Sequence, residues 1–476
     1  MGTVHAKDQQ KPPVVEDQRE NLGINGPGDD DVCSGKTGQH KFVSLDGLQA
    51  RVDKIHIDGL VRTKDDIVVE TVRDLFKAKD FQEVIVGAHA IRGKLEALGC
   101  FRNIGIFIDT SSGPGATPNG LEVTFHVREL KRIIGGVNSL IGNNEGSLVV
   151  GMKMPNLFGR GEKLQTEYSY GSKRTTGFNV SLSKPLRGKM NSVFTSTIFQ
   201  VGSEWPWSGY KQIERGLLFD VAFTSAPKVK HNLQWEAAWR DLSTLTRSAA
   251  FQVREQAGPS LKSSLRHILS VDRRDAPIFP TTGALFQLTT EFAGLGGNVG
   301  FFKNEMLLQG NFPLTSDMVI QGAIQAGLLK RLTNDKVVSM CDEFFLGGPL
   351  NLRGFETRGV GPHSDGCALG ADAYWAGAVH VYTPLPFRPG KGSFGDLFRT
   401  HCFFNAGNIG NFNFTDDYQH NLKILGTDLR MAYGIGLALR LGHMARVELN
   451  YCIPVSFKRG DRPAPGIQFG IGLQFL

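Results

Sequence analysis

From residue 132 onward, apolar and polar residues alternate in segments of roughly ten residues that are separated by turn residues. Clear examples are residues 217–223, 431–439, 445–451 and 467–475. Each segment has one continuous apolar face, while polar residues or glycine, including Arg446 and Glu448, occupy the other face. A period of two predicts strands. A soluble sandwich would bury the apolar face and a membrane barrel would turn it toward lipid, so the period alone leaves both open.

The number of segments favours the barrel. About sixteen or seventeen of them follow one another without a helical period, and open sheets of that size are rare. Membrane barrels usually have an even number of strands, and residues 247–254 are the weakest segment, so we predict sixteen. The last two residues, Phe475 and Leu476, continue the final alternating segment, as expected of a strand that closes on the first. The sequence therefore predicts a sixteen-stranded transmembrane β-barrel over residues 131–476.

Residues 46–130 have a different pattern. A strand at 51–57 is followed by a helix that Thr63 would cap, a second helix from Asp80, and strands at 104–108 and 121–127. This order predicts one small α+β domain. A free edge of its sheet is a candidate site for docking a peptide by strand addition, and a plain spacer domain fits equally well. Residues 1–45 contain few apolar residues and no signal-peptide core, so we expect a disordered tail.

Composition and charge limit the classes of function that fit the sequence. The net charge is +7, and 37 basic against 26 acidic residues (+11) lie after residue 130. This excess fits surface solubility or a basic pore lining, whereas the chain lacks the interleaved basic and aromatic residues or finger spacing of a nucleic-acid-binding protein. The six cysteines form no CxxC pair, so neither a zinc site nor a disulfide framework is predicted.

Two segments of the predicted barrel stand out. The first strand, from Ile133 to Leu140, contains the pair Gly135–Gly136, which predicts weak pairing with the last strand or else a bend next to the small domain. A connection of roughly 40 residues, between about Leu329 and Ala371, is too long for a plain loop. Because it is rich in apolar and aromatic residues, we expect it to fold back into the lumen.

Several motifs resemble the BamA-like outer-membrane-protein assembly superfamily. They are Leu352-Arg353-Gly354-Phe355, the preceding Phe345-Leu346-Gly347-Gly348, and the run from Pro155 to Glu162. The small domain resembles a POTRA domain. Bacterial members usually have several such domains and a signal peptide, whereas this sequence shows one domain and no such peptide. That pattern, together with residues 374–377, 382–390 and 403–408, is similar to the barrel subunits of the mitochondrial sorting and assembly machinery (SAM) in animals.

The resemblance implies an insertase that folds β-barrel precursors into the mitochondrial outer membrane, with the POTRA domain in the intermembrane space. The implied partners are precursor proteins, other subunits of the SAM complex, the cristae-organising complex of the inner membrane and membrane lipid. No nucleic acid, cofactor, metal or bond-making chemistry is implied. A passive or polypeptide-translocating channel of the same architecture is the alternative, and a soluble β-rich enzyme or propeller is the third reading.

The resemblance also indicates the residues that would act. A client signal in this superfamily has a polar residue, a glycine and two alternating hydrophobic residues, and the last strand repeats this pattern at Gln468, Gly470, Leu473 and Phe475. A client could therefore displace this strand from the first strand, at Ile133, Gly135, Gly136 and Val137.

Arg353 would brace the long connection inside the lumen. The positions where bacterial relatives carry its carboxylate partners are His380 and Asn405 here, so we expect hydrogen bonds rather than a strong ion pair.

Overall fold

The computed structural model describes residues 3–6, 48–142, 144–186, 191–333, 336–385, 394–412, 418–442 and 445–476. They form two compact units. One unit runs to Arg132 and includes Pro155–Gly161, and the other comprises Ile133–Met154 and Glu162–Leu476. Apart from residues 3–6, the tail predicted at 1–45 lies outside the described residues.

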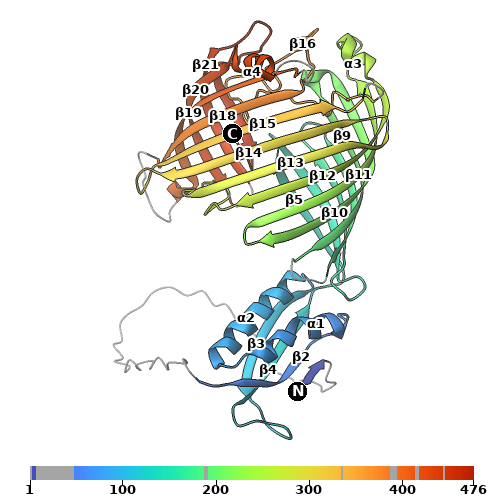
Figure 1. The fold of residues 1–476 in the computed structure, drawn as a ribbon, viewed down its shortest axis with the longest axis vertical. Helices are drawn as coiled ribbons and strands as arrows, with labels where there is room; N and C mark the ends of the chain where they lie inside the picture. The colour runs from blue at the N-terminus through green and yellow to red at the C-terminus, as the bar shows by residue number, and fades with distance from the viewer. Residues whose placement is uncertain are drawn as a thin grey trace, which may run out of the picture. The chain divides into compact units, whose positions relative to one another are not determined.

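The first unit is a four-stranded sheet, in the order β1-β2-β4-β3, with its helices packed on one face (Figure 1). Its strands are β1 (Thr3–Ala6), β2 (Arg51–Asp58), β3 (Phe101–Thr110) and β4 (Gly120–Glu129). The helices are α1 (Asp65–Val72), the short η1 (Arg73–Lys77) and α2 (Phe81–Ala97). Apolar residues of both layers form one buried core. The order strand, helix, helix, strand, strand predicted for residues 46–130 is found.

Two details of this unit differ from the sequence-based expectation. Thr63 does not cap α1, because its hydroxyl instead donates to the Glu129 carboxylate over 2.6 Å, and Lys64 takes the cap position. The edge of the sheet at β2 is occupied, since β1 pairs with β2 in parallel, and β3 forms the edge at the other end of the order. Glu129 also accepts the backbone N–H groups of Val61, Arg62 and Thr63. Burial opposes its charge, but these hydrogen bonds outweigh burial and lower the pKa of Glu129.

The segment Pro155–Gly161 packs within this first unit. The Asn156 amide donates to the Thr63 hydroxyl over 2.8 Å and accepts the backbone N–H of Gly161 over 2.9 Å. The Lys64 N–H donates to the carbonyl of Gly159. Gly159 has φ of +88°, and a Cβ atom there would lie 2.6 Å from the carbonyl oxygen of Arg62, so only glycine fits this close approach.

The second unit contains sixteen strands in one sheet, and their number confirms the prediction. Neighbours in the sheet follow one another along the chain, β5 and β22 stand at the two ends of the order, and Figure 1 shows the tilted strands curving into a barrel. The strands are β5 (Ile134–Gly142), β6 (Glu145–Pro155), β7 (Lys163–Gly171), β8 (Thr176–Pro185), β9 (Val193–Trp205), β10 (Tyr210–Ala226), β11 (Val229–Thr244), β12 (Gly258–Asp272), β13 (Gly283–Gly297), β14 (Phe301–Pro313), β15 (Val319–Arg331), β18 (Ala373–Thr383), β19 (Phe398–Gly410), β20 (Arg430–Leu441), β21 (Ala445–Ser456) and β22 (Gly466–Gly472).

Short elements occupy the connections, contrary to the expectation that no helix would interrupt the strands. They are η2 (Pro206–Ser208), α3 (Phe251–Glu255), the two-residue strands β16 (His363–Ser364) and β17 (Cys367–Ala368), η3 (Phe394–Leu397) and α4 (Tyr418–Gly426). The weak segment at 247–254 is not a strand, because α3 overlaps it. Among the described helices, none is both long enough and apolar enough to cross a bilayer.

The two faces of the barrel wall resolve the choice that the period left open. Large apolar side chains on the outer face are exposed, among them Leu148, Phe178, Ile198, Leu217, Leu265, Phe404, Ile435, Leu449 and Ile467. Polar and charged side chains on the inner face are buried, among them Arg240, Lys262, Glu291, His380, His401, Asn405, Arg446, Glu448 and Asn450. This inversion is typical of a transmembrane barrel and is the reverse of a soluble sandwich.

Candidate functional site

Strands β5 and β22 stand at the two ends of the sheet order, and we call the junction between them the seam. Two hydrogen bonds join its sides among the described residues, and Asn144 makes both. Its backbone N–H donates to the carbonyl of Ile471, and its side-chain oxygen accepts the N–H of Ile471, each over 3.0 Å. Asn144 has φ of +58°, a left-handed turn conformation that asparagine tolerates better than most residues.

The first strand contributes glycine and exposed apolar residues to the seam. Gly135 and Gly136 pair with Met152 and Gly151 of β6. Ile133 precedes the strand, and the side chain of Val137 is 63% exposed on its outer face. The strand β5 thus has a ladder on its β6 side, while its other edge meets β22 through Asn144.

The last strand is shorter than the alternation predicted. It ends at Gly472, so Leu473 and Phe475 do not continue it. Leu473 remains exposed, whereas Phe475 turns inward, is buried, and lies with its ring 4.4 Å from the Arg446 guanidinium. Phe475 was expected on the outer face of the strand, and that assignment is wrong because a cation–π contact inside the barrel holds the ring there.

Gln468 and Gly470 of the last strand contact the long segment between β15 and β18. The described residues 336–372 of that segment, which we call the strap, fold back into the barrel. Gln468 accepts the N–H of Gly354 and donates to the carbonyl of Phe355, each over 3.0 Å. A Cβ atom added at Gly470 would lie 3.0 Å from both Pro349 and Phe475. The inner face of β22 is therefore packed against the strap.

The motif Leu352–Phe355 lies at the centre of this packing. Leu352, Arg353 and Phe355 are fully buried. Gly354 has φ of +86°, and a Cβ atom there would approach the Ala432 side chain to 2.7 Å. A larger residue at this position would separate the strap from the barrel wall.

Arg353 forms a buried ion pair that the sequence comparison did not predict. Its Nε and Nη2 donate to one oxygen of Glu448 over 3.1 and 2.8 Å, and its Nη1 donates to the main-chain oxygen of Leu476 over 2.6 Å. Arg446 is a second ion-pair partner of Glu448. The carboxylate therefore stands between two arginines, one on the strap and one on its own strand β21.

His380 and Asn405, the partners expected for Arg353, contribute differently. Asn405 donates to the backbone oxygen of Arg353 over 3.1 Å, and His380 contacts the main-chain oxygen of Leu476 over 3.0 Å. His380 also contacts His401, and His401 in turn contacts the side-chain oxygen of Asn450. The Asn450 amide donates to the Glu448 carboxylate. These groups surround the ion pair rather than replace it. In the described residues, no group of three His, Cys, Asp or Glu side chains could hold a metal ion.

The strap is also held on the far side of the lumen. The Arg240 guanidinium of β11 donates to both oxygens of Asp342 over 2.8 and 3.0 Å. The Arg358 guanidinium lies 3.7 Å from the ring of Phe345 and 4.0 Å from the ring of Trp205, at the end of β9. Because it is anchored near β9–β11 and near β21–β22, the strap crosses the barrel interior.

One carboxyl group of the strap, that of Glu343, has a raised pKa. Burial first, and then the neighbouring Asp372 carboxylate, raise the pKa of Glu343 to about 7, although Arg331 opposes the shift. Arg331 lies 3.5 Å from Glu343 and 3.9 Å from Asp372. Two carboxyl groups therefore share one arginine where the strap meets β18.

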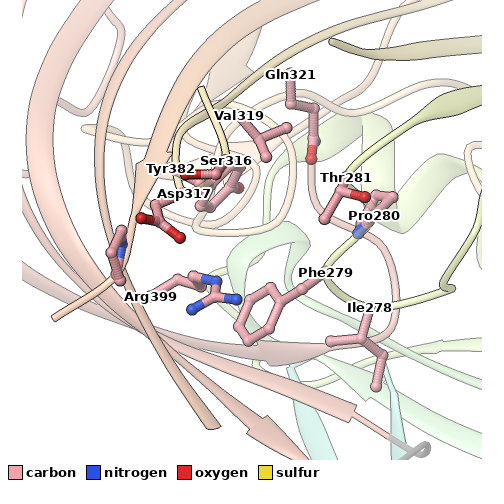
Figure 2. A pocket seen from close by; sticks show the side chains of 11 residues that line it. Ile278, Phe279, Pro280, Thr281, Ser316, Asp317, Val319, Gln321, Tyr382 and Arg399 are labelled. Carbon is pink, nitrogen blue, oxygen red and sulfur yellow. The ribbon is translucent and has the colours of Figure 1, made fainter. Parts of the chain in front are cut away.

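A small cavity lies at the opposite end of the barrel, among the β12–β13, β14–β15 and β18–β19 connections. Figure 2 shows its lining, with Phe279, Tyr382 and Arg399 around it and Asp317 at one side. Its volume is about 60 Å³. Since one water needs roughly 10–15 Å³, the cavity has room for a few waters and is too small for a polypeptide strand. The seam is therefore the better candidate for a client.

Sequence reasoning located the strap motif and both seam strands but missed Glu448 as a partner and Asn144 as the link across the seam. Glu448 carried a usable signal, because it is a charge on the lumen face of an alternating strand. Asn144 carried none, since asparagine in a tight turn is ordinary.

Comparison with known proteins agrees with this architecture. The Omp85 superfamily domain matches residues 156–475. The sorting and assembly machinery component 50 homolog A of Xenopus laevis is 45% identical, and the human homolog is 43% identical, with each pair covered over its full length. The crystal structure of Haemophilus ducreyi BamA lacking POTRA domains 1–3 superposes with a TM-score of 0.72 at 19% identity. The superposition covers 89% of this chain and 84% of the BamA chain, so the two proteins share a fold. The chain therefore belongs to the Omp85 superfamily and, within it, to the family of sorting and assembly machinery component 50 homologs.

Proposed function

We propose that this chain folds β-barrel precursors and inserts them into the mitochondrial outer membrane through the seam between β5 and β22. The observation that carries the proposal is the contrast between the long ladders elsewhere in the wall and the Asn144 link at the seam. The names of the relatives, sorting and assembly machinery components, support the same role.

The hydrogen bonds that Asn144 makes across the seam oppose its opening only weakly. Each hydrogen bond contributes about 0.5–1.5 kcal/mol net, so two of them oppose opening by about 1–3 kcal/mol. A precursor strand in lipid has unpaired backbone groups that cost several kcal/mol each. Pairing that strand with β5 by strand addition satisfies these groups and offsets the cost of opening.

The contacts of Gln468 suggest how a client signal would compete. A client with the same pattern of a polar residue, glycine and two hydrophobic residues would take the place of β22 against β5. Displacement of β22 would release the Gly354 and Phe355 backbone groups that Gln468 holds. The arrival of a client would thereby change the contacts of the strap.

Photo-crosslinking in isolated mitochondria tests the proposal. A photoreactive amino acid is placed at Val137 on β5 or at Ile467 on β22, which are 63% and 75% exposed. Gly470 is a poor position, because a side chain there would meet Pro349 and Phe475. We expect an arrested barrel precursor to crosslink at both seam positions. Leu265, exposed on β12, is the matched control and should give no adduct.

The same experiment separates the insertase from a translocating channel. A probe at Asp220, a lumen-facing residue of β10, reports on chain passing through the barrel. Precursor adducts at Asp220 without adducts at Val137 and Ile467 would contradict the insertase proposal and favour the channel.

We further propose that residues 46–130 form a POTRA domain in the intermembrane space that receives precursors, with other SAM subunits and the cristae-organising complex as partners of the assembled chain. Protease added after selective rupture of the outer membrane should cleave this domain, and protease added to intact mitochondria should not. Cleavage in intact mitochondria would place the domain on the other side.

A further inference from the structure

Helix α4 is fastened to the outer face of the barrel. The indole N–H of Trp375 donates to the carbonyl of Leu425 over 2.9 Å. The Asn408 amide donates to the carbonyls of Ile424, Leu425 and Thr427 over 3.2, 3.1 and 2.7 Å. The last carbonyls of a helix have no partner within it, so these bonds fix the end of α4 to β18 and β19.

The positions of Trp375 and Asn408 show on which face of the barrel wall α4 lies. Trp375 and Asn408 are paired in the β18–β19 ladder, so they share one side of the sheet. Val379 and Phe404, also paired, lie on that same side at even spacing and are 50% and 46% exposed. This is the apolar outer face, and α4 therefore lies on the side of the barrel that faces lipid.

A groove of about 470 Å³ separates α4 from the wall. This volume is within the range of roughly 300–1,000 Å³ that is typical of small-ligand sites. Its lining is almost entirely apolar and includes Met306, Ala326, Leu328, Trp375, Leu422 and Leu425. Leu422 and Ile424 of the helix are 65% and 41% exposed.

Two lysines are close in sequence to residues that line the groove. Lys330 is exposed on β15, two residues beyond Leu328 and therefore on the same outer face. Lys423 is exposed on α4, between Leu422 and Ile424. Apolar walls beside two cations match the two parts of an anionic phospholipid, whose acyl chain is apolar and whose phosphate is negative.

We propose that the groove between α4 and strands β14, β15 and β18 binds one anionic phospholipid, with an acyl chain against Ala326 and Leu422 and the phosphate near Lys330 and Lys423. The site lies in the hydrocarbon-facing surface, so lipid reaches it without any opening of the barrel. This inference rests on the transmembrane barrel and is independent of the insertase proposal.

Photolabelling of the full chain in phosphatidylcholine nanodiscs tests the site. The probe is phosphatidylglycerol with a photoreactive group in its acyl chain, and adducts are mapped by mass spectrometry. We expect adducts concentrated on the peptides that contain Met306, Trp375 and Leu422. The variant Ala326→Trp fills the groove and should reduce these adducts at least fivefold, whereas Ile324→Trp, on the same face of β15 outside this groove, should not.

The charge requirement has its own test. The double variant Lys330→Gln with Lys423→Gln should lower labelling by the phosphatidylglycerol probe severalfold and leave labelling by a phosphatidylcholine probe unchanged. Heat-modifiable migration in gels verifies that every variant still forms the barrel. Uniform labelling of the outer face that Ala326→Trp does not change would show ordinary boundary lipid and overturn the proposal. A protein that crosslinks to a probe at Leu422, in the absence of lipid adducts, would also overturn it.

Discussion

The β10–β11 wall and the β5–β22 seam are built from the same alternating pattern but are held together differently. Strands β10 and β11 have 17 and 16 residues and share a nearly continuous ladder, whereas β5 and β22 have 9 and 7 residues and meet through Asn144. On the seam side, stability comes instead from the strap, through Arg353, Glu448 and Gln468. Backbone pairing thus maintains the wall, whereas β22 is held mainly by β21 and by side-chain contacts with the strap.

The largest effect is expected from Glu448→Gln. Removal of one member of a buried ion pair leaves the other charge without its partner, which costs about 3–5 kcal/mol. The melting temperature of the detergent-solubilised chain should fall, and assembly of radiolabelled barrel precursors in mitochondria should fall with it. Glu291→Gln removes one of the two carboxylates that pair with Lys262 in the back wall, the other being Glu236, and is the control. It should lower the melting temperature by a smaller amount and preserve assembly. Equal assembly in the two variants would remove the special role of the seam side.

A smaller effect is expected from Glu343→Gln, and its size depends on pH. Because the pKa of Glu343 is raised to about 7 in the folded chain, the native state holds a proton there that the unfolded chain has already lost. The stability that this bound proton contributes to the folded chain is fully present below the ordinary carboxyl pKa and is lost as pH rises through 7. Between pH 5 and pH 8, the free energy of unfolding of the unmodified chain should therefore fall by on the order of 1–3 kcal/mol. The Glu343→Gln variant should not show this fall. Thermal melts at both pH values measure the difference, and parallel curves would contradict it.

The smallest effect is expected from Asn144→Gly. Glycine keeps the left-handed turn and removes the side-chain bond to Ile471, a change of about 0.5–1.5 kcal/mol. The melting temperature of the barrel should hardly change, while crosslinking of an arrested precursor at Val137 should increase. Lys228→Gly, at another left-handed turn between β10 and β11, is the control. An increase in crosslinking for both variants would show a general loosening rather than an effect on the seam.

The sequence supports prediction of the barrel more fully than of the contacts inside it. Strand alternation is local, since the pleat alone sends successive side chains to opposite faces, and residues 431–439 and 445–451 lie within strands as predicted. The inward turn of Phe475 depends on Arg446, which approaches only in the folded barrel. The pairing of Arg353 with Glu448 joins residues 95 positions apart. Such contacts follow from sheet closure, which a local pattern does not encode.

Hydrogen exchange of the full chain in nanodiscs, with and without a peptide that carries a client signal, tests the central claim most directly. Without peptide, the amides of Gly135–Leu140 and Ile467–Ile471 should exchange well before those of β10 and β11. With peptide, the amides of β5 should become protected while those of β22 exchange faster. Equal protection of seam and back wall without peptide, or no change at β5 on its addition, would contradict a seam that admits a client strand.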